Sequence, residues 1–237
     1  MTKLSVNINK IATLRNSRGS NFPNLIDFAK IIQSLGADGI TVHPRPDERH
    51  IKYSDIFDLK PVVYKEFNIE GNPIEKFIDL VIKNKPNQVT LVPDAESDLT
   101  SSAGWDTIKN KSYLKEVVSE FKSNGIRTSI FLDPKLKYIE PLNEIGTERI
   151  EFYTEAYAKN YRLNKEKAIE SYAICAKHIS EMGIGINAGH DLDLNNIKFF
   201  KNNVENLLEV SIGHALIVES IQLGIKNVIE KYLSYLK

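Results

Sequence analysis

Eight short runs of apolar, often β-branched residues recur along the chain. They lie at residues 4–9, 39–43, 62–70, 88–93, 127–133, 149–154, 185–188 and 208–213. Runs of this length and composition are typical of β-strands. The pattern therefore predicts eight strands.

The segments between these runs carry apolar residues three or four positions apart, which places them on one face of a helix. A stripe of this kind packs a helix onto a sheet. Four such stripes are clear: Leu25, Phe28, Ala29 and Ile32; Leu114, Val117, Val118 and Phe121; Ala168, Tyr172, Cys175, Ile179 and Met182; and, after the eighth strand, Val218, Ile221, Ile225, Ile229 and Tyr232.

Glycine follows several of the helical patterns and precedes the next strand, as at Gly36, Gly125, Gly146 and Gly183. A glycine there can take the left-handed conformation that ends a helix. Alternation of strand, helix and glycine favours parallel strands joined by crossover helices. Eight such strands predict an α/β fold, a (β/α)8 TIM barrel, as a single domain over residues 1–237. An open doubly wound sheet is the weaker alternative, because no Gly-x-Gly-x-x-Gly follows the first strand.

Composition narrows the classes of partner. The 237 residues include 31 basic and 31 acidic side chains, so the formal net charge is zero and no global field attracts nucleic acid or an anionic membrane. Residues 1–10 alternate apolar and polar types, which predicts neither a signal peptide nor a membrane span. The lone Cys175 cannot form an internal disulfide, in agreement with a reducing compartment. We expect a cytoplasmic protein.

In a barrel, the loops that follow the carboxyl ends of the strands share one mouth, so polar residues there meet although they are distant in sequence. The chain places many candidates at these positions: Asn7, Asn9, Lys10, Arg15 and Arg18 after the first strand; His43, Arg45 and His50 after the second; Glu70, Thr100, Glu151, His190, Asp191, Gly213 and His214 after later ones.

Histidine is concentrated in this set. Four of the five histidines belong to it, and His178 alone lies inside a helical pattern, where it is expected on the surface. Histidine acts as acid or base near neutral pH, so several around one mouth suit a series of proton transfers. Any one of them is equally well explained as a hydrogen-bonded structural residue.

Two glutamates are candidate acids or bases. Glu70 ends an apolar run, and partial desolvation there raises a carboxyl pKa toward the range of a general base. The alternative for Glu70 is an ion pair with a neighbouring Arg or Lys. Glu151 is a second acid or base, orients an amine, or is a buried partner of another charge.

Two phosphate sites are expected. Gly213 and His214 lead directly into a helix, so backbone N–H groups and the positive end of the helix dipole point at the mouth. Arg15, Arg18 and Arg45 are candidates for a second anion clamp. A metal site is the rival use of the histidines and carboxylates, but His-x-His, His-Glu-x-x-His and cysteine pairs are all absent from the sequence.

Several strings resemble the pyridoxine 5′-phosphate synthase family, in order and with similar spacing from residue 4 to the last helix. They are VNINKIATLRN at 6–16 with Arg18-Gly19, GADGITVH at 36–43 with Arg45 and Arg49-His50-Ile51, NIE at 68–70, LVP at 91–93, NAGH at 187–190 and IGHA at 212–215.

This resemblance implies a metal-free barrel enzyme without a cofactor. Such an enzyme condenses 3-amino-2-oxopropyl phosphate with 1-deoxy-D-xylulose 5-phosphate to pyridoxine 5′-phosphate, inorganic phosphate and water, and forms homo-oligomers, typically octamers. It also implies roles, all at positions of this sequence: His43 and Glu70 as proton acceptors, His190 as proton donor, Glu151 as transition-state stabiliser, and Asn7, Arg18, Arg45, His50, Thr100, Asp191, Gly213 and His214 as substrate-binding residues.

The chain departs from the family pattern at several places. Asn9-Lys10 stands where Asp-His is common, the sixth strand reads Glu151-Phe152-Tyr153-Thr154-Glu155 where a histidine and a glycine are common, Asp191 stands where glycine is common, and Glu219 replaces an arginine. Asp191 puts a negative charge near an expected phosphate. A different phosphosugar enzyme, such as an isomerase or aldolase, and a non-catalytic phosphosugar-binding protein remain as alternatives.

Overall fold

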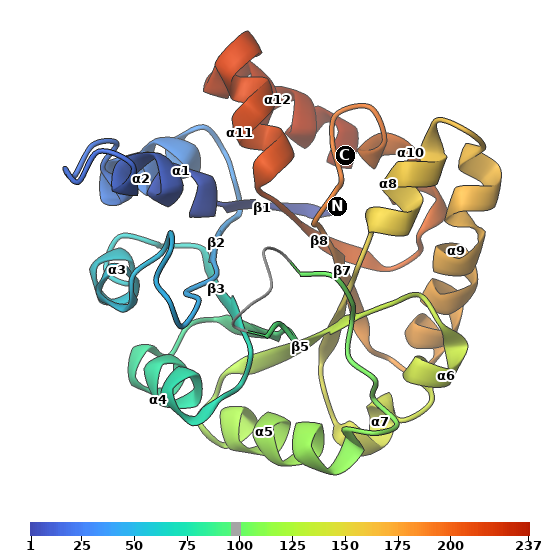
Figure 1. Ribbon diagram of the computed structural model, residues 1–237. Coiled ribbons are helices and arrows are strands. Elements are labelled where there is room, and N and C mark those ends of the chain that lie inside the picture. Colours follow the sequence, from blue (N-terminus) through green and yellow to red (C-terminus); the bar gives the residue numbers. More distant parts are fainter. Residues whose placement is uncertain (96–100) are drawn as a thin grey trace.

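The computed structural model describes residues 1–95 and 101–237. Within these residues, eight parallel strands hydrogen-bond in chain order and β8 returns to β1, which closes the barrel (Figure 1). The barrel class is therefore confirmed and the open sheet is excluded. The strands are β1 (Lys3–Asn7), β2 (Gly39–Val42), β3 (Glu66–Gly71), β4 (Gln88–Leu91), β5 (Arg127–Leu132), β6 (Arg149–Phe152), β7 (Gly185–Ala188) and β8 (Leu207–Ile212).

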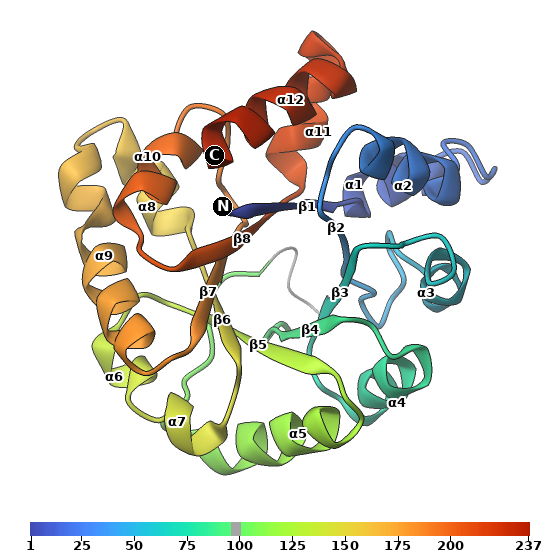
Figure 2. The ribbon, with the colours of Figure 1, turned by 180° about the vertical axis from the view of Figure 1, so that it is seen from behind.

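Helices surround the strands on the outside, as Figure 2 shows from the rear. The first three apolar stripes predicted from the sequence face inward, with Ile32, Phe121 and Ile179 fully buried. The helices are α1 (Asn9–Asn16), α2 (Leu25–Ser34), α3 (Tyr53–Leu59), α4 (Glu75–Asn84), α5 (Lys111–Ser123), α6 (Leu136–Ile139), α7 (Leu142–Ile145), α8 (Glu155–Tyr161), α9 (Lys165–Glu181), α10 (Ile197–Asn203), α11 (His214–Leu223) and α12 (Ile225–Leu236).

The helix ends also follow the sequence. The side chain of Asn24 accepts hydrogen bonds from the backbone N–H groups of Ile26 and Asp27, a cap that stabilises a helix by about 1 kcal/mol. The four glycines expected to end helices, Gly36, Gly125, Gly146 and Gly183, all have positive φ. His178 lies on the outer face of α9 with half of its side chain exposed, as predicted.

Two expectations are wrong in detail. The third strand begins at Glu66 rather than at residue 62. The side chain of Gln33 explains this, because its amide donates to the carbonyl of Val62 and its oxygen accepts from the N–H of Tyr64. These bonds hold residues 62–65 as a loop against α2, away from the ladder.

The apolar stripe after the eighth strand belongs to two helices and not to one. Gly224, with φ +80, separates α11 from α12. Val218 and Ile221 on α11 are 42% and 77% exposed, whereas Ile229 and Tyr232 on α12 are buried. The two halves of the stripe therefore have different surroundings.

The interior of the barrel is polar, and this positions the site above it. The Ser5 and Thr41 hydroxyls lie 2.7 Å apart, and Thr90 donates to the side chain of Asn68. Nearer the amino ends of the strands, four buried or half-buried charges pair: Glu66 with Arg127, and Arg149 with Glu209. Hydrogen-bonding side chains thus fill the barrel interior from the amino ends of the strands toward the carboxyl ends.

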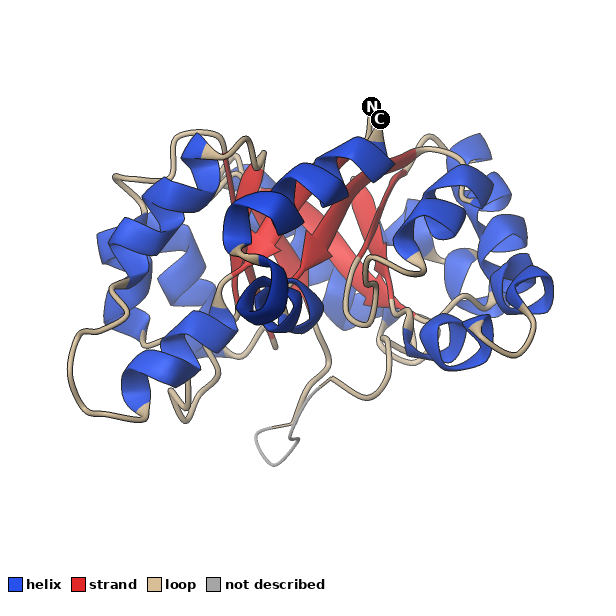
Figure 3. Ribbon diagram, turned by 90° about the horizontal axis from the view of Figure 1, so that it is seen from above, coloured by secondary structure: helices blue, strands red, loops and turns tan. Residues whose placement is uncertain are grey.

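The two termini lie together at the end of the barrel where β1 begins, and α12 packs against β1 (Figure 3). The carboxyl ends of the strands open on the opposite side. Among the described residues, no helix has both the length and the apolar character needed to cross a membrane.

Candidate active site

A cavity of about 540 Å³ opens at the carboxyl ends of the strands, within the size range of small-ligand sites. Its lining residues come from the ends of strands all around the ring and from the loops that follow them. It is lined by Asn7, Asn9, Lys10, Thr13, His43, Arg45, Arg49, His50, Glu70, Thr90, Val92, Ser101, Phe131, Glu151, His190, Asp191, Ser211, Gly213 and His214.

Most of the predicted site residues line this cavity. Thr100 lies outside the described residues. Arg18 is exposed just beyond α1 and is not part of the lining. Arg15 is buried and gives two hydrogen bonds to the carboxylate of Asp55, at 2.6 and 2.8 Å, so it braces α1 against α3. The predicted clamp of Arg15, Arg18 and Arg45 is therefore not assembled in this chain.

Hydrogen bonds from the end of β1 and the start of α1 hold Glu70 and His43 in place. Asn7 donates through Nδ2 to Glu70 Oε2 at 3.3 Å, and its Oδ1 accepts from the backbone N–H of Asn9. The side chain of Asn9 in turn accepts from the backbone N–H of His43 at 2.9 Å. Asn9 thus orients the end of β2 without a charge.

His43 lies between two carboxylates. Its Nδ1 is 3.9 Å from Oε2 of Glu70, and its Nε2 is 3.9 Å from Oδ2 of Asp94. Burial, aided by the neighbouring Arg45, lowers the pKa of His43 well below its ordinary value. At neutral pH this imidazole is uncharged and able to accept a proton.

The pKa of Glu70 moves the other way. Burial raises it to about 8, and the negative charge of Asp94 adds to the effect. Glu70 is therefore an ionisable group whose proton is exchanged close to neutral pH, the property expected of an acid–base catalyst. Among the described residues, the Glu70 carboxyl contacts Asn7 and His43 and forms no ion pair with an Arg or Lys, which was the alternative expected for it.

Glu151 is buried at the end of β6. One of its oxygens, Oε2, has no hydrogen-bond partner within the described residues. Burial raises its pKa well above the ordinary value, and the nearby charge of Glu70 adds to the effect. A protonated carboxyl in this position can donate a hydrogen bond to a ligand in the cavity.

The close approach of β7 to β8 explains the glycine before His190. A Cβ atom on Gly189 would lie 2.4 Å from the carbonyl oxygen of Ser211 and 3.0 Å from Oε1 of Glu151. Only glycine fits there without a shift of the backbone. Gly189 thus lets the chain bring His190 and Glu151 into the same mouth.

His190 is fixed from three sides. Its Nδ1 lies 2.6 Å from Oδ2 of Asp191. The ring of Tyr153 meets it edge-on with centroids 5.1 Å apart, and Phe131 lies 6.4 Å away. The Tyr153 hydroxyl donates to Glu155, so two of the departures from the family pattern contact each other beside His190.

His50 has a defined tautomer. Its Nδ1 accepts from the backbone N–H of Ile51 at 2.9 Å, which leaves the proton on Nε2. Burial lowers its pKa to about 4, and Arg45 adds to the effect. His50 is therefore a neutral donor at physiological pH.

Two positions in the cavity suit anions. The N-terminus of α11 presents Gly213 and His214 to the mouth. Elsewhere in the lining, Lys10 and Arg49 supply positive charge close to His50. Within the described part of the chain, no three His, Cys, Asp or Glu side chains converge as metal ligands do.

Glu219 has a structural role in this chain. Its Oε1 accepts from the N–H of Leu194 and its Oε2 accepts from the hydroxyl of Tyr232 at 2.6 Å. It thus fastens the loop after β7 to α12.

Sequence reasoning missed several lining residues and one buried neighbour. Asp94 follows β4 as Glu70 ends β3, so a search of strand ends for carboxylates would have found it. Thr90 and Phe131 lie within strands, where only the register of the barrel decides which side chains face the cavity. Ser101 and Ser211 carry no sequence signal.

Solved structures with the same architecture support the fold. A 4-hydroxy-2-oxoglutarate aldolase from TTHB1 superposes with a TM-score of 0.63 at 12% identity, over 90% of this chain and 88% of that one. Phosphoribosylanthranilate isomerase from Thermotoga maritima gives a TM-score of 0.60 at 13% identity, over 100% and 98%. At such low identity the likeness concerns the fold alone.

Curated relatives are far more similar. Proteins named pyridoxine 5′-phosphate synthase from Christiangramia forsetii and Flavobacterium johnsoniae are each 62% identical over 237 residues, the whole of both chains. The one from Bacteroides fragilis is 54% identical over the same length. The sequence model of a family described as pyridoxal phosphate biosynthesis protein PdxJ matches residues 4–237. The chain belongs to the PdxJ family.

Proposed function

We propose that this enzyme is a pyridoxine 5′-phosphate synthase, which condenses 3-amino-2-oxopropyl phosphate with 1-deoxy-D-xylulose 5-phosphate and releases inorganic phosphate and water. The observation that carries the proposal is the meeting of Glu70, Glu151, His43 and His190 in one cavity, which Lys10, Arg49 and the N-terminus of α11 also line. The family and the names of the full-length relatives support the same reaction.

The reaction needs protons moved at several atoms. An imine forms from the amine of one substrate and the ketone of the other, phosphate is eliminated, and the ring closes. We assign His43 and Glu70 as proton acceptors, because one is a neutral imidazole and the other titrates near pH 8. His190 is the proton donor, with its ring held by Asp191 and Tyr153. Glu151 stabilises the transition state through a hydrogen bond from its carboxyl.

Two phosphorylated substrates require two anion sites. Gly213, His214 and the N-terminus of α11 bind one phosphate, and Lys10, Arg49 and His50 bind the other. The remaining substrate contacts in this proposal come from Asn7, Arg45, Thr100 and Asp191. Arg18 is also assigned to substrate binding, although it does not line the cavity of the single chain. Holding both substrates together removes several kcal/mol, roughly, of the entropic cost of a bimolecular condensation.

We further propose that the enzyme acts in the cytoplasm as a homo-oligomer, an octamer by its resemblance, with no nucleic acid or membrane as partner. Apolar side chains on the outer face of α11, among them Val218 and Ile221, are exposed in the single chain and are suited to contact another copy. Light scattering coupled to gel filtration measures the mass directly. A monomer at micromolar concentration would contradict this part.

The test is inorganic phosphate release by chelator-treated protein given both substrates and then each alone. Release that requires both, with a product that absorbs as a 3-hydroxypyridine and large losses in Glu70→Gln and His190→Asn, supports the synthase. Binding of both substrates without release would favour a phosphosugar-binding protein. Turnover of a single substrate would favour an isomerase or aldolase, and release only after metal addition would contradict metal-free chemistry.

A further inference from the structure

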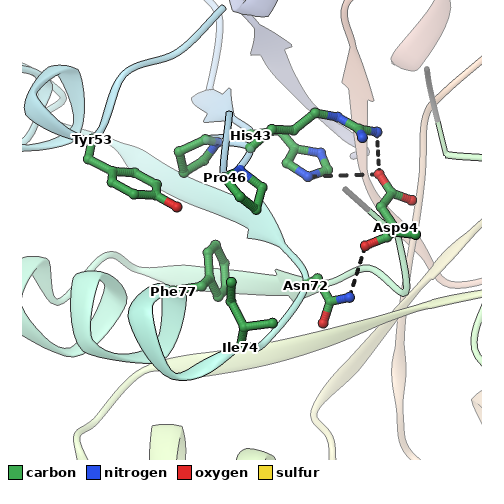
Figure 4. Close-up of a pocket in the computed structure, with 10 residues that line it drawn as sticks. His43, Pro46, Tyr53, Asn72, Ile74, Phe77 and Asp94 are labelled. Atoms are coloured by element: carbon green, nitrogen blue, oxygen red, sulfur yellow. Dashed lines mark hydrogen bonds and ion pairs between the residues drawn. The ribbon is translucent and has the colours of Figure 1, made fainter. Parts of the chain in front are cut away.

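A small cavity lies behind the main one, separated from it by His43 and Arg45, which line both. Figure 4 shows its other walls, formed by Tyr53, Ile74 and Phe77, with Asp94 at one end. Its volume of about 10 Å³ has room for one water molecule at most. The substrates therefore cannot enter it. Any effect of Asp94 on the substrates is therefore transmitted through His43 and Arg45.

The carboxylate of Asp94 is buried and its partners are charged or polar. Its Oδ2 accepts from Arg45 Nη2 at 2.5 Å and from the hydroxyl of Ser101 at 2.9 Å. The same oxygen lies 3.9 Å from Nε2 of His43 (Figure 4). The side chains of Asp94 and Arg45 are each only 5% exposed. A buried pair of this kind is kept in one geometry, because loss of either partner leaves an uncompensated charge.

The backbone at Asp94 is held as well. The side-chain amide of Asn72, just beyond β3, donates to the carbonyl oxygen of Asp94 at 2.9 Å (Figure 4). Asp94 is thus hydrogen-bonded to Arg45 after β2 and to Asn72 after β3, close to His43 and Glu70. A negative charge fixed at this point acts on both members of the acid–base pair.

We propose that Asp94 is a positioning residue of the active site, which holds the Arg45 guanidinium from behind and sets the charge that surrounds the His43–Glu70 pair. The proposal rests on the proposed function, since it concerns the same site. Of the neighbouring charges, Asp94 is the one that raises the pKa of Glu70 most, after burial. Asp94 thereby makes the Glu70 carboxylate a stronger base, beside the neutral His43.

Other charges face the pair from the surrounding strands and must be counted in any titration. Around Glu70 and His43 they are Arg45, Arg49 and His50 from the loop after β2, Asp94 after β4, Glu151 on β6, His190 after β7 and Glu209 on β8. Substitutions at Asp94 leave all the others in place, so a change in the titration of Glu70 reports on Asp94.

The experiment follows the protonated carboxyl of Glu70 by isotope-edited infrared spectroscopy of the full chain across pH, with the band assigned by its loss in Glu70→Gln. We expect the midpoint to fall by about one pH unit in Asp94→Asn, because a neighbouring negative charge is removed. Ser101→Ala removes a hydrogen bond to the same oxygen without a change of charge, and its midpoint should match the wild type. An unchanged midpoint in Asp94→Asn would overturn the proposal.

Asp94→Asn removes a buried charge that pairs with Arg45, so the variant is at risk of unfolding. The double variant Asp94→Asn/Arg45→Gln removes both charges of this pair, and the midpoint should also fall in it. An unchanged midpoint there is equally decisive against the proposal. In parallel, the rising limb of kcat/KM against pH for phosphate release should move to lower pH in Asp94→Asn. A merely structural role lowers the rate at every pH and leaves the limb in place. If the wild type releases no phosphate, the proposed function fails, but the infrared titration still decides the role of Asp94.

Discussion

The Nδ1 atom of His190 lies 2.6 Å from Oδ2 of Asp191, the next residue in the chain. A carboxylate at neutral pH only accepts, so the imidazole donates from Nδ1, and its ring plane is fixed between Asp191 and Tyr153. His190 itself has a φ of +34, an uncommon backbone conformation for a residue with a side chain. The carboxylate that stands near an expected phosphate therefore also orients the proton donor.

These two effects of Asp191 predict that its removal lowers both kcat and KM. In Asp191→Asn, kcat should fall about tenfold because the ring is held less firmly, while KM for the phosphorylated substrates should fall because a repulsive charge is removed. Steady-state kinetics on both substrates measures the split. Asp58→Asn, which removes one exposed charge on α3, is the matched control and should change neither constant. A rise in KM in Asp191→Asn would contradict this assignment.

Substitution of Glu151 should lower activity without lowering the stability of the fold. Glu151→Gln keeps the shape of the side chain and removes a buried carboxyl, one oxygen of which has no hydrogen-bond partner in the part of the chain that the structure describes. We expect kcat to fall by about a hundredfold, since a donor to the developing charge is altered, whereas the melting temperature stays level or rises. Melting curves at pH 8 alongside kinetics test both parts. A clear loss of stability would mean that Glu151 has a supporting role in the fold.

Stability should decline as the pH rises from 6.5 to 8. Burial raises the pKa of Glu70 to about 8 and that of Glu209 to about 7, so these groups hold protons in the folded state that the unfolded chain has released. Each such group lowers the free energy of unfolding by up to about 1.4 kcal/mol per pH unit, between its unfolded and its folded pKa. His43 and His50 act in the opposite direction, but only below their unfolded pKa of about 6.5, so they do not enter this window.

Urea unfolding at half-unit steps of pH provides the measurement, with Glu70→Gln as the comparison. In that variant the decline above pH 7 should be shallower. A wild-type stability that rises from pH 6.5 to 8 would show that the buried carboxyls are ionised in the folded protein.

The glycine before His190 predicts a local packing defect. In Gly189→Ala the new Cβ meets the carbonyl of Ser211 at 2.4 Å, so the end of β7 must move. We expect a loss of stability of about 2 kcal/mol or more together with a large loss of activity. Gly125→Ala is the control: its φ is +73 and nothing lies within 4 Å of the new Cβ, so it should cost about 1 kcal/mol and leave activity intact.

The fold was largely predictable from the chain because hydrophobic spacing and helix-ending glycines are local signals. The start of β3 was not, because the bonds from Gln33 that hold residues 62–65 come from a helix about 30 positions earlier. The division between α11 and α12 was missed since Gly224 interrupts an unbroken apolar stripe.

The site was predictable where a residue stands at a strand end, as His43 and Glu70 do. Arg15 has the chemistry of a phosphate ligand, and only the position of Asp55 40 residues later decides that it braces two helices instead. The sequence places Asp94 at a strand end, but its importance depends on contacts with Arg45 and His43, which lie about 50 positions earlier in the chain.

The meeting of β1 with β8 has a consequence for how the protein is made. The hydroxyl of Thr2 donates to the carbonyl of Leu207, 205 residues further along, and α12 covers the same seam. During synthesis the edge of β1 that pairs with β8 stays without its partner strand until almost all of the chain has been produced. Contacts between such distant segments form slowly, so the seam is the last part of the ring to close and the part most exposed to aggregation on the ribosome.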